Sequence, residues 1–205
     1  MGRDKKLPGG GAGGWDAQVH ELRQLFAQGK HTRLEARARQ MVSRSPEFAL
    51  GWKILSIAQL LQGRDALEAA RRSVELLPDD AEAHNNLAKA LQDAGRFEES
   101  RQACLQALRV EPGFAFAYNN LGIALDQLGV FDEAQAAYER ALEHSPSLAD
   151  AALNLGHLLS RRGHAGPAME AYRRAADADP ASTRASRALA RMLMELGRPD
   201  EAIAV

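Results

Sequence analysis

The sequence predicts an all-α solenoid, in which pairs of helices repeat along the chain and stack on one another. Two consecutive segments, 81–114 and 115–148, are identical at 14 of 34 positions. Prolines recur at intervals of 32, 34, 34 and 34 residues from Pro46 to Pro180, and a glycine recurs near the middle of each period. A fixed period of this size is typical of stacked repeats. Aromatic residues make up only 5% of the chain and apolar residues 45%, so the core must be mostly alanine and leucine, which favour helix over sheet.

The first segment, residues 1–14, precedes the repeats. Its charged residues are followed by glycines, and it has too few apolar side chains to offset its ordering entropy. We therefore expect a disordered tail or the remnant of a tag. No apolar run follows its basic residues, so it is not predicted to be a signal peptide. The repeat domain should then span residues 15–205.

Each repeat should contain two helices, as the segment 115–148 illustrates. Apolar or small residues from Tyr118 to Leu125 recur at i, i+3, i+4 and i+7, which places them on one helix face. Gly129 should end this helix, because glycine is common just past a helix C-terminus. Asp132 should then begin the second helix as its N-cap. A small residue recurs where the two helices must approach closely: Ser56, Ala88, Gly122, Gly156 and Ala190.

The repeats should follow one another without long linkers, and the second is two residues shorter than the others, near Arg64. The last repeat stops a few residues into its second helix, so Leu189, Leu193 and Leu196 should lack most of their cover. We therefore expect that the chain is truncated, or that this end docks onto a second copy or a further domain. The expected copies are a degenerate first copy at 15–48, then 49–80, 81–114, 115–148, 149–182 and a partial copy at 183–205.

The pattern aromatic-x-x-Leu-Gly/Ala-x-x-Leu, followed at fixed offsets by Gly, Ala, aromatic, Ala and Pro, resembles the tetratricopeptide repeat. The resemblance implies a right-handed superhelix that binds a protein or an extended peptide in a concave groove. It also implies that positions 2, 5, 6, 9 and 12 of each copy point into that groove. The groove residues expected on this basis are Asn85, Asn86, Lys89, Phe116, Asn119, Asn120, Ile123, Asn154, His157, Arg184, Arg187 and Arg191.

The asparagines among these residues recur with the period of the repeat. Asn86, Asn120 and Asn154 all occupy position 6, at intervals of 34 residues. An amide has two donor hydrogens and an acceptor, which suits the backbone of an extended peptide whatever its sequence. We expect a ladder of amides that contacts such a peptide. The alternative is that these asparagines cap or bridge neighbouring helices.

The copies that contain "NNLG" and "NNLA", together with "SPEFALGWKIL", resemble the repeats of bacterial O-linked N-acetylglucosamine transferases of the Spindly type. They are also similar to repeats fused to some bacterial sulfotransferases. The first resemblance implies the non-catalytic part of a larger bacterial glycosyltransferase, which recruits substrates or partners. The alternatives are a standalone scaffold that self-associates, or the repeat region of a sulfotransferase.

Two further groups at the expected groove positions suggest particular contacts. Arg184, Arg187 and Arg191 share one helix, and their guanidinium groups suit a carboxylate or phosphate. The alternative is a solvated face on which Arg191 pairs with a glutamate four residues later. Phe116 is either an aromatic anchor for a ligand or a residue that packs on the neighbouring repeat.

Several function classes are not expected. The sequence contains no nucleophile–base set, P-loop or dinucleotide-binding turn, so we expect no enzymatic activity and no cofactor. Its six histidines lack the spacing of metal ligands, and its single cysteine, Cys104, forms neither a disulfide nor a thiolate cluster. A net charge of −1 argues against general nucleic-acid binding, and no apolar run approaches the ~20 residues of a membrane span. We therefore expect a cytoplasmic protein that binds neither nucleic acid nor a membrane.

Overall fold

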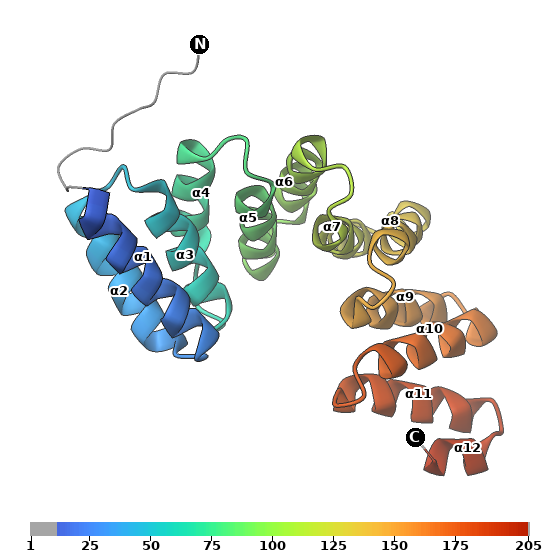
Figure 1. Ribbon diagram of the computed structural model, residues 1–205. Helices are drawn as coiled ribbons and strands as arrows, with labels where there is room; N and C mark the ends of the chain where they lie inside the picture. The colour runs from blue at the N-terminus through green and yellow to red at the C-terminus, as the bar shows by residue number, and fades with distance from the viewer. Residues whose placement is uncertain (1–11, 205) are drawn as a thin grey trace. The chain divides into compact units, whose positions relative to one another are not determined.

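The computed structural model describes residues 12–204, with side chains from residue 17 onward (Figure 1). Twelve α-helices and no strand occur in this range. Most of the expected tail, residues 1–11, lies outside the described residues, and α1 takes up the last three tail positions. The helices are α1 (Ala12–Ala27), α2 (His31–Arg44), α3 (Ala49–Leu60), α4 (Leu67–Leu76), α5 (Ala81–Asp93), α6 (Phe97–Val110), α7 (Ala115–Gln127), α8 (Phe131–His144), α9 (Ala149–Arg161), α10 (Ala165–Ala178), α11 (Thr183–Glu195) and α12 (Pro199–Ile203).

The chain divides into two compact units, residues 1–77 with α1–α4 and residues 78–205 with α5–α12. Within each unit every helix packs against the next one along the chain. In the second unit α7 also contacts both α5 and α9, so the first helices of successive repeats form a continuous layer. The prediction of an all-α solenoid of helical pairs is therefore confirmed.

A glycine in the left-handed conformation ends the first helix of every pair. The φ angles of these six glycines lie between +63° and +79°, and no described residue other than glycine has a positive φ. Residues with a Cβ rarely adopt this conformation, which explains why glycine recurs here. After Gly129, the amide of Val130 donates to the carbonyl of Leu125 at 2.9 Å, which closes the helix end. The glycines are Gly29, Gly63, Gly95, Gly129, Gly163 and Gly197.

The start of α8 differs from the prediction. Its N-cap is Val130, without a side-chain cap, and Asp132 lies in the first turn of the helix. The prediction that Asp132 is the N-cap is therefore wrong. The reason is that the tight turn leaves a single residue between Gly129 and the first helical residue, Phe131, so no room remains for a capping aspartate.

The two helices of a repeat approach closely at the conserved small position. A Cβ added to Gly122 would lie 2.5 Å from Cε1 of Tyr138, and one added to Gly156 would lie 2.5 Å from Cδ1 of Tyr172. Both tyrosine rings are buried. The small residue on the first helix therefore makes room for the ring of the second, as the spacing predicted.

The shortened repeat of the first unit is held by a buried carboxylate that the sequence analysis missed. Glu35 of α2 accepts hydrogen bonds from Arg39 (3.0 Å), and from Gln62 (2.9 Å) and Arg64 (2.8 Å) in the turn before α4. Burial raises the pKa of the Glu35 carboxyl, but the hydrogen bonds from Arg39 and Gln62 and the charges of Arg64 and Arg39 outweigh it. The pKa therefore lies below its ordinary value.

The last helical pair is better covered than expected. Leu189 and Leu193 are buried, because α11 packs against both α10 and the short α12. The expectation that these two leucines lack their cover is therefore wrong. Leu196 is exposed, as are Met194 and Ile203.

Candidate ligand-binding face of the second unit

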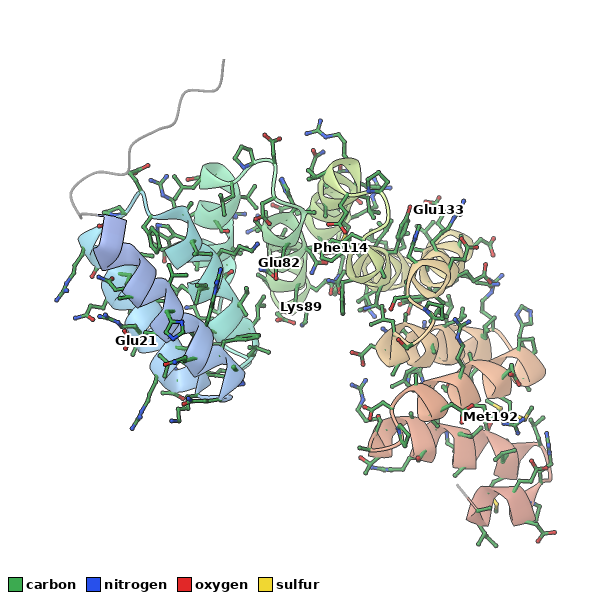
Figure 2. The ribbon with its side chains drawn as sticks, in the orientation of Figure 1. Glu21, Glu82, Lys89, Phe114, Glu133 and Met192 are labelled. Carbon is green, nitrogen blue, oxygen red and sulfur yellow. The ribbon has the colours of Figure 1, made fainter. Side chains whose placement is uncertain are left out.

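All twelve predicted groove residues lie on α5, α7, α9 and α11, the first helices of the four repeats of the second unit. We call the surface that carries positions 2, 5, 6, 9 and 12 of these helices the first-helix face. Lys89 projects from α5, and Phe114 lies at the start of α7 (Figure 2). Successive helices from α5 to α11 pack against one another, and α7 also contacts α5 and α9 directly, so the side chains of this face have fixed relative positions.

The asparagines on this face bond to one another across repeats. Asn120 Nδ2 donates to Asn85 Oδ1 at 2.8 Å, and Asn154 Nδ2 donates to Asn119 Oδ1 at 3.0 Å. Asn86 and Asn120 are each only 8% exposed. These are the bonds that the helix-bridging alternative predicts, and they leave little of each amide free for a peptide.

The sequence carries a signal for this pairing that the prediction of a ladder overlooked. An asparagine at position 5 of one copy is followed by an asparagine at position 6 of the next, as in Asn119 and Asn154. Copy 149–182 has Leu153 at position 5, and the next copy has Ala188 at position 6. Both of these residues are buried. A polar pair is thus replaced by an apolar pair.

Asn86 is the exception to the pairing. It occupies position 6 of the first copy in the second unit, so no earlier asparagine of its unit can accept from it. Its Nδ2 atom is buried and has no hydrogen-bond partner among the described residues. A buried donor without a partner carries a desolvation cost that the paired asparagines avoid.

Position 12 also joins successive repeats. Gln92 Nε2 of α5 donates to the backbone oxygen of Asn120 in α7 at 2.7 Å. Asp126, at the same position of the next copy, forms an ion pair with Arg161 of α9. The polar side chains at positions 5, 6 and 12 therefore hold the layer of first helices together.

Positions 2 and 9 remain open to a ligand. Phe116 is 55% exposed and makes an edge contact with Phe114, with 6.0 Å between ring centroids. Ile123 is half-buried on the same helix. Lys89 is exposed and forms an ion pair with Asp93 one turn later. The middle of the face thus combines an exposed aromatic ring with a half-buried aliphatic side chain.

The remaining predicted residues gather at the far end of the face. His157 of α9 and the three arginines of α11 line one pocket of about 470 Å³. The Tyr172 hydroxyl lies 2.9 Å from His157 Nδ1, and the two rings meet edge to face. Burial lowers the pKa of His157, and the positive charges of Arg191, Arg184 and Arg161 lower it further. The imidazole is therefore neutral near pH 7.

Other kinds of site are less well supported. Within residues 12–204 no group of three or more His, Cys, Asp or Glu side chains is placed to hold a metal ion. Burial raises the pKa of the Cys104 thiol to about 12, so it stays protonated. Among the described helices, none combines the length and the apolar character that crossing a bilayer requires.

Comparison with known proteins identifies the type of repeat. The family description "Tetratricopeptide repeat" matches residues 79–147, and a second description of the same name matches residues 119–183 and 153–205. A search of curated proteins gave no significant match. Solved structures match more widely, and at about 20% identity they show the fold alone.

Three of the matching structures serve as examples. PilF of Pseudomonas aeruginosa is 21% identical, with 92% of this chain and 87% of that chain covered and a TM-score of 0.76. PilW, described as a widely conserved type IV pilus biogenesis factor, is 19% identical, with 92% and 89% covered and a TM-score of 0.79. Human IFIT1, solved as a dimer with m7Gppp-AAAA, is 19% identical, with 85% and 45% covered and a TM-score of 0.73.

Proposed function

We propose that this chain, which belongs to the tetratricopeptide-repeat family, is a protein-interaction module that binds an extended peptide along the first-helix face of its second unit. The observation that carries the proposal is the exposure of Phe116. Most other apolar side chains of α7 are buried, and Ile123 is half-buried, whereas the Phe116 ring meets solvent over more than half of its surface.

An exposed aromatic ring on a rigid surface suits an anchor for a partner. Aromatic residues are enriched among the few contacts that dominate binding energy, because a ring buries a large apolar area with little loss of side-chain freedom. Phe116 and Ile123 stand seven residues apart, which places them two turns apart along the same helix. Together they offer an apolar contact of the size of one or two peptide side chains.

The test starts from a library of random peptides displayed on phage and selected on the whole chain. We expect the selected peptides to bind at least about tenfold more weakly to Phe116→Ala, which corresponds to about 1.4 kcal/mol. Phe131→Ala is the matched control, because Phe131 is 45% exposed but lies on α8, a second helix. Equal losses in both variants, or no loss in either, would overturn the proposal.

Self-association is a second candidate, favoured by the last helical pair. Met194, Leu196 and Ile203 are exposed there, and Ile203 is 85% exposed. Grouped apolar side chains on a surface favour contact with a second copy of the chain. Light scattering after size exclusion should then show a dimer or larger species that Ile203→Glu returns to a monomer. A monomer at every concentration would exclude this candidate.

The narrower hypothesis of a glycosyltransferase context rests on the resemblance of several repeat segments, and the asparagine ladder is one part of that resemblance. Because Asn120 and Asn154 donate to other asparagines, the ladder serves helix packing and gives that context no added support. The sulfotransferase alternative rests on sequence resemblance alone. Our proposal is therefore limited to an interaction module, and the identity of any attached enzyme forms no part of it.

A further inference from the structure

The pocket at the far end of the first-helix face is strongly basic. Arg184, Arg187 and Arg191 project from α11, and His157 of α9 completes the wall. Positive side chains three and four residues apart on a helix repel one another and weaken the helix. The arrangement is therefore unfavourable unless something negative lies nearby.

The chain itself supplies little negative charge here. Arg184 and Arg187 form no ion pair and no hydrogen bond with any described residue. Arg191 has one carboxylate neighbour, Glu195, whose Oε1 lies 3.9 Å from its Nε, at the limit of an ion pair. Many other arginines of the chain pair closely, as Arg161 does with Asp126. The α11 arginines are thus available to an external anion.

His157, the fourth polar residue that lines the pocket, is held in one orientation by Tyr172. Burial raises the pKa of the Tyr172 hydroxyl, and its interactions with Ser160 and Arg191 partly oppose this. The Tyr172 hydroxyl lies within hydrogen-bond distance of His157 Nδ1, at 2.9 Å, and this contact restrains the imidazole ring.

The arginines form a row and do not converge on a point. Arg184 and Arg191 are seven residues apart, and at 1.5 Å per residue their backbones are separated by about 10 Å along the axis. A single phosphate group is too small to occupy a row of this length. In an extended peptide, side chains at i and i+2 project from the same face about 7 Å apart. Two acidic side chains with that spacing fit within the length of the row.

We propose that this pocket binds an acidic-x-acidic segment of an extended peptide, through paired hydrogen bonds from the α11 arginines to its two carboxylates. Each guanidinium presents a planar fork that matches a carboxylate. The inference rests on the proposed peptide-binding function and adds the chemical class of the ligand at one end of the face. It assigns the apolar contact to Phe116 and the acidic contact to α11.

The test uses a short fluorescein-labelled peptide of glycine and serine that contains Glu-Ala-Glu, with fluorescence anisotropy on the whole chain. We expect binding that weakens at least about tenfold in the double variant Arg184→Ala/Arg187→Ala. Arg109→Ala is the matched control, since Arg109 is an exposed arginine of α6 without an ion pair among the described residues. The same peptide with two glutamines should not bind, and one with adjacent glutamates should bind more weakly.

Three results would overturn the inference. An equal loss in Arg109→Ala would show attraction by overall charge. Equal binding of adjacent and separated glutamates would contradict the row geometry. Tighter, Arg184-dependent binding of a phosphoserine peptide or a short RNA would assign the pocket to phosphate.

Histidine ring NMR gives a local readout, because the His157 signals should shift with Glu-Ala-Glu and stay unchanged in the double variant.

The outcome also separates this inference from the proposed function. If library-selected peptides bind through Phe116 while Glu-Ala-Glu does not bind, only the acidic assignment fails. If Glu-Ala-Glu binds through α11 but Phe116→Ala changes nothing, the apolar anchor fails and the basic pocket stands. Circular dichroism of each variant should match the wild type, since the arginines are exposed.

Discussion

Tyr138 fills the space that any side chain at residue 122 would need. A Cβ at Gly122 would stand 2.5 Å from its ring, closer than side chains approach one another. Copy 81–114 uses the opposite combination, with Ala88 at the glycine position and the smaller Cys104 at the tyrosine position. The volumes of these two positions are therefore matched within each repeat, which close packing requires.

The first prediction compares two glycines in helices. Gly122→Ala should lower the free energy of unfolding by about 1–3 kcal/mol, because the added methyl overpacks against Tyr138. Gly166→Ala in α10 should have a smaller effect, because nothing beyond its chain neighbours and its own helix lies within 4 Å of its added Cβ. Urea denaturation followed by circular dichroism measures both. Equal effects of the two changes would contradict the packing described here.

The second prediction compares two asparagines at position 6. Asn120→Ala should cost about 0.5–1.5 kcal/mol, because it removes the bond to Asn85. Asn86→Ala should cost less, because its Nδ2 has no partner among the described residues. Thermal unfolding of the two variants measures both losses of stability. A larger loss of stability for Asn86→Ala than for Asn120→Ala would contradict the pairing of asparagines described here.

At the scale of helices and turns, the glycines were the most reliable guide. Each one ends a first helix because its positive φ reverses the chain, and this requirement is local enough to be read from the sequence. The Glu35 cluster was not predictable in the same way. Its partners Gln62 and Arg64 lie 27 and 29 residues away. The arginines that follow the helix-ending glycine in two other copies, Arg96 and Arg198, pair instead with a glutamate three residues later.

The third prediction concerns the pH dependence of that cluster. The folded pKa of Glu35 is below its ordinary value of 4.5, so its stabilisation is complete above that value and is lost as the pH falls through the folded pKa. Glu35→Gln should therefore cost about 1–3 kcal/mol at pH 7, and the cost should fall as the pH is lowered from 4.5 toward 3. Both tryptophans, Trp15 and Trp52, belong to the first unit, so their fluorescence in urea reports its unfolding.

A control for this third prediction removes a charge at the surface. Glu143→Gln breaks an exposed pair with Arg140 on α8, and such pairs contribute little. It should leave the tryptophan signal unchanged at both pH values. If Glu35→Gln loses as much stability at pH 3 as at pH 7, the carboxylate charge is not what holds the turn before α4.

At the scale of the whole molecule, the sequence predicted where the helices lie but not how their polar side chains are used. The period placed the twelve candidate residues on four first helices, and the structure agrees. It could not show that the asparagines bond to each other, because a bond depends on the relative rotation of two helices. The α11 arginines are exposed and line one pocket together with His157, and their role in binding a ligand stays a prediction.

The most direct test of the central claim is a chemical-shift titration of the isotope-labelled whole chain with a library-selected peptide. The account predicts that the largest amide shifts fall on α5, α7, α9 and α11, with the greatest near Phe116. The second helices α6, α8 and α10 should change little. Shifts concentrated on the second helices, or on residues 17–77, would show that the partner binds elsewhere and would contradict the first-helix face as the binding surface.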